Sequence, residues 1–126
     1  MDRQQGCISG DIRDPNRQST QTKDDLLLRG DRVKVGLPGN LRDFSYTDRG
    51  GSVRKYSEID YFGQHAGFAA SPQETINYVE AHDNQTLFDL NAYKLPAATS
   101  LADRVRVQNL GAAINLFSQG IPFFHA

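Results

Sequence analysis

The stretch TINYVEAHDNQTLFD, residues 75–89, decides the fold that this sequence predicts. Its first part is rich in β-branched and aromatic side chains, so we expect residues 75–80 to form a buried strand. NQTLFDLNAYK, residues 84–94, then predicts a short helix or turn that ends before Pro96. His82 and Asp83 lie between the two segments, where a strand ends and a polar turn begins.

The clearest helix signal follows this turn. Ser100 and Asp103 resemble a capping box at the start of LADRVRVQNLGAAINLFSQ, residues 101–119. Apolar side chains recur along this segment at spacings of three, four and five, which predicts one apolar stripe, and DRVRVQ (103–108) predicts a solvated face. The stripe consists of Leu101, Val105, Leu110, Ala113, Ile114 and Phe117.

A second apolar strand is expected from Ile121 onward, after a glycine, Gly120, at the left-handed C′ position that commonly follows a helix. Strand, helix, glycine and strand make a βαβ unit, which predicts parallel strands and a right-handed crossover. His82 and Asp83 would then lie just past the carboxyl end of the first strand. Open α/β sheets and eight-stranded barrels bind ligands at that edge, so the position favours a functional role.

The segments before residue 75 predict smaller elements. DDLLLRGDRVKVGLPG (24–39) indicates a short helix, and DFSYTDRGGSVRKYS (43–57) indicates a β-hairpin with its turn at 48–51. IDYFGQHAGFAASP (59–72) is expected to be an irregular loop rich in glycine and aromatic residues. Residues 1–25 are expected to form a mobile polar segment, and 26–126 the folded part.

Composition narrows the possible partners. The chain has 126 residues, 38% of them hydrophobic, and a net charge of −1, which gives no electrostatic reason to expect nucleic acid or an anionic membrane. Cys7 is the only cysteine, so no internal disulfide can form and no structural zinc motif is present. The sequence has no apolar run typical of a signal peptide or a membrane span; we leave the compartment open, with the cytoplasm as the default expectation.

Several segments together resemble one enzyme family. They are KVGLPGNLRDF (34–44), SEIDYFGQHAGFAASPQETINYVEAHDNQTLFD (57–89), LADRVRVQNL (101–110) and SQGIPFFHA (118–126). This combination resembles the starch-debranching glycoside hydrolases of the pullulanase and limit-dextrinase type, which belong to the α-amylase superfamily. The resemblance implies a catalytic (β/α)8 barrel that hydrolyses α-1,6-glucosidic branch links in pullulan, glycogen or amylopectin dextrins with retention of configuration.

The resemblance also implies roles for individual residues. Asp83 matches the third catalytic carboxylate, a transition-state stabiliser that binds sugar hydroxyls, and His82 matches a histidine that binds the same sugar. Hydrogen bonds to the sugar 2-hydroxyl strengthen in the oxocarbenium-like transition state, and an ionised acceptor makes them stronger still. Tyr61, Phe62 and Phe68 are candidates for stacking on glucose rings, and anchoring of their loop is an equally open role.

Retaining hydrolysis also needs a nucleophile and a general acid about 5 Å apart, which this family takes from the fourth and fifth barrel strands. The 74 residues before Thr75 contain neither motif. We therefore expect an α/β fold made of about the last two or three βα units of a partial (β/α)8 (TIM) barrel, with a small β-hairpin excursion. Such a piece is expected to be inactive alone, and to be poorly soluble or self-associating because it exposes unpaired strands.

Other interpretations of these residues stay open. Asp83 or Asn84 could cap the next helix, and His82 and Asp83 could bind a metal with His65, although we predict neither a metal site nor a cofactor. Some members of the superfamily bind calcium, but no residue here matches such a site. Glu80 is expected to be packed or ion-paired. The roles of Asn40, Arg42, Asp43 and His125 are left open.

Three functional hypotheses follow. The leading one is a fragment of an α-1,6-glucan hydrolase that binds an α-glucan through His82 and Asp83 but lacks the nucleophile and the acid. The alternative is a non-catalytic glucan-binding or interaction module. The third is a split enzyme, in which another chain supplies the missing part of the barrel. Neither nucleic acid nor a membrane is an expected partner.

Overall fold

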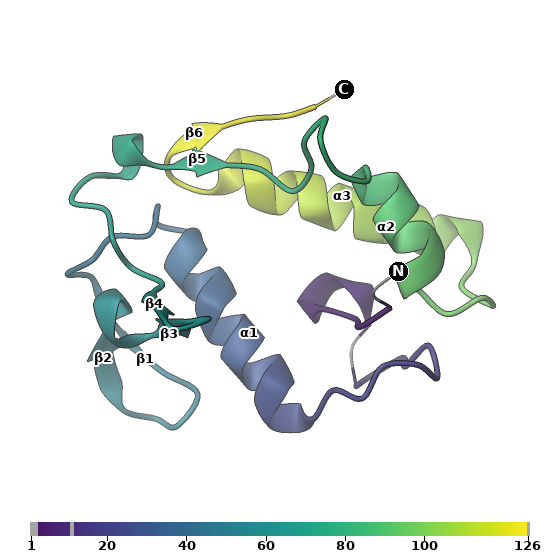
Figure 1. Ribbon diagram of the computed structural model, residues 1–126, viewed down its shortest axis with the longest axis horizontal. Coiled ribbons are helices and arrows are strands. Elements are labelled where there is room, and N and C mark those ends of the chain that lie inside the picture. Colours follow the sequence, from purple (N-terminus) through teal and green to yellow (C-terminus); the bar gives the residue numbers. More distant parts are fainter. Residues whose placement is uncertain (1–2, 11, 126) are drawn as a thin grey trace.

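The computed structural model describes residues 3–10 and 12–125 and shows an α/β arrangement of short elements (Figure 1). The helices are α1 (Lys23–Gly36), α2 (Leu87–Lys94) and α3 (Leu101–Phe117), and single 3₁₀ turns occur at Cys7–Ser9, Tyr56–Glu58 and Pro72–Glu74. The strands are β1 (Ser45–Thr47), β2 (Val53–Lys55), β3 (Asp60–Tyr61), β4 (Gln64–His65), β5 (Ile76–Asn77) and β6 (Ile121–Pro122). In the described residues they pair as three two-stranded sheets, and no closed barrel forms.

Helix α1 and the hairpin β1–β2 form one half of the molecule. The predicted helix and hairpin are both confirmed, and Asp48 to Gly51 make the turn through a backbone hydrogen bond of 3.0 Å. A small apolar core of Val35, Tyr56, Ile59 and Ala66 joins the helix to the hairpin region, with Tyr46 packed against it. The hairpin is therefore held by its packing on α1, since two short strands alone are marginally stable.

Helices α2 and α3 form the other half, and α3 contradicts the predicted stripe. Its buried residues are Gly111 and Asn115, whereas Leu101 and Phe117 are 77% and 85% exposed. Arg104, in the segment predicted to be a solvated face, is half-buried and donates to the carbonyl oxygens of Thr99, Asn91 and Pro96. The small and polar side of α3 therefore faces inward, because the neighbouring loop and α2 offer carbonyl groups as well as apolar contacts.

Strands β5 and β6 confirm the predicted parallel pairing. Ile76 lies opposite Ile121, and Asn77 lies opposite Pro122, with α3 between the strands in sequence (Figure 1). The prediction of a buried strand is wrong, because each strand is two residues long and Ile76 is 63% exposed. β6 is the one strand that pairs with β5 in the described residues, so the apolar side chain of Ile76 stays open to solvent.

Gly120 departs from its expected place as the helix C′ residue. Ser118 is the C-cap of α3, and Gly120 lies two residues beyond it with a φ of 117°. A Cβ at Gly120 would lie 2.7 Å from Thr75 Oγ1. The glycine therefore allows the chain to pass close to the start of β5, and it is needed for strand approach rather than for helix capping.

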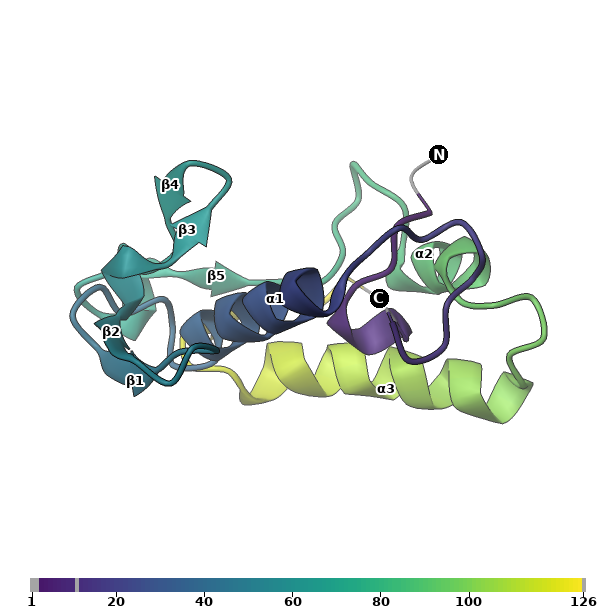
Figure 2. The ribbon, with the colours of Figure 1, turned by 90° about the horizontal axis from the view of Figure 1, so that it is seen from below.

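The segment 59–72 was expected to be an irregular loop, and this is partly wrong. Asp60 pairs with His65 and Tyr61 with Gln64, which makes a second antiparallel hairpin, β3–β4. Figure 2 shows this hairpin standing out from the rest of the molecule. Phe62 and Gly63 form its two-residue turn with φ values of 53° and 84°, the left-handed conformation that such turns require at both positions.

The N-terminal segment lies against both halves. Gln5 is almost fully buried and donates to the backbone oxygens of Ser9 and Asp14, and Asn16 donates to Lys94 O at the end of α2. Helix α1 begins at Lys23, before the expected boundary at residue 25. The division at residue 25 and the mobility of the first segment remain predictions, and residues 1, 2 and 11 of that segment lie outside the described part.

The described residues contain no helix that is both long and apolar enough to cross a membrane.

Candidate functional site

The turn that carries His82 and Asp83 follows the carboxyl end of β5. Backbone bonds from Ile121 N to Thr75 O and from Phe123 N to Asn77 O, of 2.9 and 2.8 Å, fix the direction in which the chain leaves β5. Both His82 and Asp83 are exposed in this turn. Within residues 3–10 and 12–125, neither side chain makes a hydrogen bond or an ion pair, so both are free to meet a ligand.

The residues on either side of the pair hold the turn. Glu80 accepts a 2.5 Å hydrogen bond from Leu87 N, the first residue of α2. Thr86 caps that helix by accepting from Asp89 N at 3.2 Å. The alternative that Asp83 or Asn84 caps the helix is therefore wrong. Thr86 and Asp89 have the spacing of a capping box with Asp in place of Glu, a signal in the sequence that would have located this cap.

The second set of predicted site residues lies at the tip of the β3–β4 hairpin. Tyr61 is 52% exposed and Phe62 is 78% exposed, and their rings meet edge to face with centroids 5.1 Å apart. We call these two residues the aromatic tip. Phe68 is also exposed and lies on the loop after the hairpin. Exposed aromatic faces suit the apolar faces of sugar rings, so this geometry is compatible with stacking.

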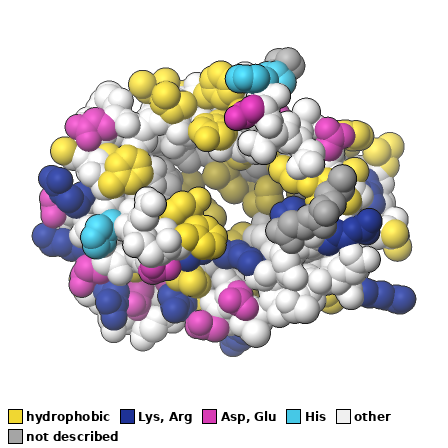
Figure 3. Space-filling model, in the orientation of Figure 1, with side chains coloured by type: hydrophobic (Ala, Val, Ile, Leu, Met, Phe, Trp, Pro, Cys, Tyr) yellow, Lys and Arg dark blue, Asp and Glu magenta, His cyan; other side chains and the backbone are white. Residues whose placement is uncertain are grey.

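A cavity of about 640 Å³ lies between α1, the β3–β4 hairpin, β5 and the end of α3. Figure 3 shows hydrophobic side chains gathered around a hollow in the middle of the molecule. Tyr61 and Phe68 line the cavity, together with polar side chains that include Arg32, and His82 and Asp83 do not. The structure therefore brings Tyr61 and Phe68 to one cavity, while Phe62, His82 and Asp83 lie outside its lining.

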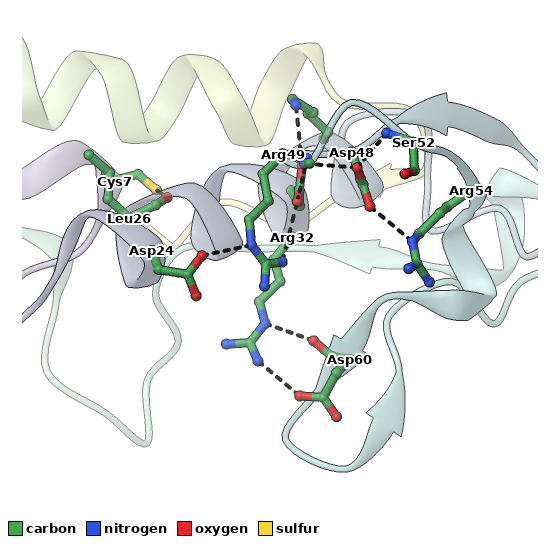
Figure 4. A network of polar contacts seen from close by, with 12 residues as sticks. Cys7, Asp24, Leu26, Arg32, Asp48, Arg49, Ser52, Arg54 and Asp60 are labelled. Atoms are coloured by element: carbon green, nitrogen blue, oxygen red, sulfur yellow. Dashed lines mark hydrogen bonds and ion pairs between the residues drawn. The ribbon is translucent and has the colours of Figure 1, made fainter.

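The sequence analysis gave no role to Arg32, which the structure connects with the aromatic tip. Its guanidinium carbon lies 4.5 Å from the centroid of the Phe62 ring and 5.5 Å from that of Tyr61. Arg32 Nε also donates to Asp60 O at 2.9 Å (Figure 4). Asp60 lies 28 residues after Arg32, and no sequence motif connects the two positions, so the sequence carries no signal for this contact.

The motif GNLRDF, whose role was left open, connects α1 to the hairpins. Asn40 has a φ of 53° and accepts from the backbone N–H groups of Phe68 and Ala69. Arg42 N donates to Ala69 O at 2.8 Å. Hydrogen bonds from Lys55 and then Arg42 lower the pKa of the Asp43 carboxyl below its ordinary value. These contacts give the motif a structural role beside the cavity.

The remaining candidates occupy separate positions. His65 lies on β4, and its Nδ1 is 2.5 Å from the backbone oxygen of Ser57 in the 3₁₀ turn Tyr56–Glu58. His125 is half-buried near the described end of the chain. In the part of the chain that the structure describes, no three His, Cys, Asp or Glu side chains come together as a metal site. His65 is therefore not assembled with His82 and Asp83.

Comparisons with known proteins place this geometry in one family. No family model matches the chain. Pullulanase from Klebsiella pneumoniae is 43% identical over 119 residues, which are 94% of this chain and 11% of the relative. "Pullulanase 1, chloroplastic" from Arabidopsis thaliana is 38% identical over 128 residues, which are 98% of this chain and 13% of the relative.

Solved structures agree with the sequence comparison. PulA from Klebsiella oxytoca superposes with a TM-score of 0.91 and 43% identity, over 94% of this chain and 11% of its own. A maltotriose complex of PulA from Klebsiella pneumoniae gives a TM-score of 0.90, also at 43% identity, over 93% of this chain and 13% of its own. The chain is a pullulanase homologue.

The predicted resemblance to pullulanase-type glycoside hydrolases is thus confirmed. The chain spans about a tenth of the length of the curated pullulanases that it matches.

Proposed function

We propose that this chain is a segment of a debranching glycoside hydrolase that cleaves α-1,6-glucosidic links in pullulan, glycogen or amylopectin dextrins with retention of configuration. In this proposal the segment supplies His82 and Asp83 to the sugar at the cleavage point. The single observation that carries it is the 43% identity to pullulanase across 94% of the chain. The exit of the pair from the carboxyl end of a parallel strand supports the same conclusion.

The chemistry assigned to the pair follows from its side chains. Asp83, as an ionised carboxylate, accepts a hydrogen bond from a sugar hydroxyl, and this bond strengthens as positive charge develops on the ring. His82 donates from a ring N–H to a second sugar oxygen and so limits the orientation of the ring. Neither side chain has to break an internal hydrogen bond first, because neither makes one within the described residues.

Exposure sets a limit on what this pair does alone. Water competes with a sugar for an exposed carboxylate, so the net gain from each hydrogen bond is about 1 kcal/mol. Electrostatic stabilisation becomes large where water is excluded. We propose that further βα units of a (β/α)8 barrel, on the same polypeptide or on another chain, cover the pair and supply the nucleophile and the general acid.

The parallel sheet supports a role for such additional units. Four apolar side chains of this sheet are exposed: Ile76 on β5, Tyr78 after it, Ile121 on β6 and Phe123 after it. Two-residue strands with apolar side chains open to solvent gain stability when neighbouring strands pair with them and helices cover them. A barrel arrangement gives β5 and β6 such neighbours.

The test is hydrolysis of pullulan by the purified 126-residue chain, alone and mixed with a Klebsiella pneumoniae pullulanase from which the matching segment has been deleted. We expect no release of maltotriose by the chain alone, and release from the mixture that is lost with Asp83→Ala. Asp89→Ala, an exposed carboxylate on α2, is the control and should retain activity in the mixture. A mixture that is equally active with Asp83→Ala would refute the role of Asp83.

A non-catalytic glucan-binding module is the second candidate, and the aromatic tip favours it. Tyr61 faces a cavity of about 640 Å³ that is separate from His82 and Asp83. Titration with maltotriose distinguishes the two functions: a module binds the sugar with both His82→Ala and Asp83→Ala in place, whereas a catalytic segment loses binding with those changes.

A further inference from the structure

The aromatic tip is presented by a very small structure. The β3–β4 hairpin has two residue pairs, Asp60 with His65 and Tyr61 with Gln64. A hairpin of this size is not stable on its own in water, and its two aromatic side chains are more than half exposed. Contacts from outside the hairpin must therefore hold the two rings in a fixed arrangement.

Arg32 of α1 provides these contacts. Its Nε donates to Asp60 O at 2.9 Å, and its terminal nitrogen lies 3.3 Å from Asp60 Oδ2 (Figure 4). The side chain of Arg32 is only 17% exposed, so the guanidinium is held between α1 and the hairpin. The other carboxylate oxygen of Asp60 accepts from Gly63 N at 2.9 Å. A continuous set of polar contacts thus runs from α1 to the turn of the hairpin.

The same guanidinium lies over the rings of the aromatic tip. Its carbon is 4.5 Å from the Phe62 centroid and 5.5 Å from the Tyr61 centroid, within cation–π range. Because Phe62 remains 78% exposed, most of its surface stays open on the side away from Arg32. A glucose ring can stack on an aromatic face that is already fixed from behind.

The backbone of Phe62 supports a functional reason for this arrangement. Its φ of 53° is unusual for a bulky residue, because the left-handed conformation brings Cβ too close to the backbone. Asparagine or glycine would form the same turn with less strain. An aromatic side chain thus occupies this position at a cost to stability, and such strained positions are common at ligand-binding sites.

We propose that Arg32 is a positioning residue that holds Tyr61 and Phe62 as one rigid platform for an α-glucan chain. This inference rests on the proposed glucan-binding function and adds to it a residue that never needs to touch the sugar. Removing Arg32 leaves two mobile rings, and each side chain that must be ordered on binding weakens the affinity about two- to tenfold.

The experiment compares Arg32→Gln, Arg32→Lys and the control Arg54→Gln in the full chain. Arg54 is an arginine of the other hairpin, β1–β2. It lies on β2, is paired with Asp48 at 2.9 Å and does not contact the aromatic tip. Binding of maltotriose is measured by calorimetry. Hydrogen exchange of the Gly63 amide is measured without ligand, with the Gly51 amide of the β1–β2 turn as the internal reference.

We expect Arg32→Gln to weaken maltotriose binding about tenfold and to accelerate exchange at Gly63 but not at Gly51. Arg32→Lys should weaken binding about threefold, because an ammonium keeps the charge but lacks the planar fork that matches Asp60 O and Asp60 Oδ2. Arg54→Gln should stay within about twofold of the wild type. Arg32→Lys is the smaller change. If Arg32→Gln does not fold, the test uses the binding and exchange of Arg32→Lys.

Each other result overturns something specific. If either Arg32 variant binds maltotriose as tightly as the wild type does, the positioning role is refuted and the glucan-binding proposal stands. Faster exchange at both glycines in Arg32→Gln means a general loss of stability and also refutes it. A wild-type chain that does not bind maltotriose refutes the glucan-binding proposal, and the role of Arg32 falls with it.

Discussion

The carboxylate of Glu80 accepts a 2.5 Å hydrogen bond from the backbone N–H of Leu87, across the turn that contains His82 and Asp83. The first N–H groups of a helix have no partner within the helix, and a carboxylate near them is also favoured by the helix dipole. One side chain therefore joins the end of the β5 segment to the start of α2. The position of the His-Asp pair depends on this bond.

Glu80→Ala should lower the free energy of unfolding by about 1–2 kcal/mol, since it leaves Leu87 N without its acceptor. Urea unfolding measures the change. Glu58→Ala is the matched control, because Glu58 accepts a similar short bond from Lys55 N at 2.6 Å in the other half of the molecule. Both variants should lose stability, but Glu80→Ala alone should change the NMR signals of His82.

Asp31 and Asp24 both meet Arg49, but in different surroundings. Asp31 is fully buried and accepts from Arg49 N at 3.1 Å, whereas the Asp24 side chain is 75% exposed. We expect Asp31→Ala to destabilise the chain by about 1–3 kcal/mol, because it leaves Arg49 N without its acceptor and removes the ion pairs of Asp31 with Lys34 and Arg49. Asp24→Ala should cost about 0.5 kcal/mol or less. Equal effects in thermal unfolding would contradict this account.

Two glycine substitutions should have opposite signs. Gly120→Ala puts a Cβ 2.7 Å from Thr75 Oγ1 at a φ of 117° and should destabilise the chain by about 1–3 kcal/mol. Gly30 lies inside α1 with no atom within 4 Å of the added Cβ, so Gly30→Ala should stabilise by about 0.5–1 kcal/mol. Chemical denaturation of both variants checks the signs.

Tyr46 makes stability depend on alkaline pH. Burial, and then the nearby carboxylates of Asp31 and Asp48, raise the pKa of Tyr46 from 10.0 to about 12. The folded state therefore keeps this proton longer than the unfolded state, so its contribution is complete below pH 10 and is lost as the pH rises from about 10 to 12. Tyr46→Phe should flatten this decline in unfolding experiments.

The same variant has a second expected effect near neutral pH. The Tyr46 hydroxyl is buried, and it makes no hydrogen bond of good geometry among the described residues, although the Asp31 carboxylate lies near it. Replacing it with hydrogen removes a polar group that burial penalises, so Tyr46→Phe should be as stable as the wild type or slightly more stable. A clear loss of stability at pH 7 would mean that the hydroxyl has a partner.

Local chemistry explains which parts of the fold could be predicted. Ser100 caps α3 by accepting from Asp103 N at 3.1 Å, as the sequence pattern indicates. The turn of the first hairpin and the parallel pairing of β5 with β6 were also predictable, since glycine positions and the strand–helix–strand order determine them. His82 and Asp83 come after the strand, but β5 ends at Asn77 rather than at residue 80, so four residues separate it from His82.

Burial could not be predicted in the same way. The inward face of α3 depends on the absence of a side chain at Gly111, where a Cβ would lie 2.6 Å from Leu87 Cδ2. It also depends on the loop carbonyl groups that accept hydrogen bonds from Arg104, and the hydropathy pattern of the sequence cannot predict these bonds. Arg32 was missed for a similar reason, because its contacts with Asp60 and Phe62 exist only after the hairpin has folded onto α1.

Arg104 acts as a clasp between two helices. Its guanidinium reaches Asn91 O on α2, Pro96 O in the loop and Thr99 O before α3, at 3.0–3.2 Å. A lysine ammonium has no planar fork that could serve three such carbonyls. Anyone who grafts this helix pair onto another scaffold must therefore transplant the arginine with it, even though it belongs to neither the aromatic tip nor the His-Asp turn.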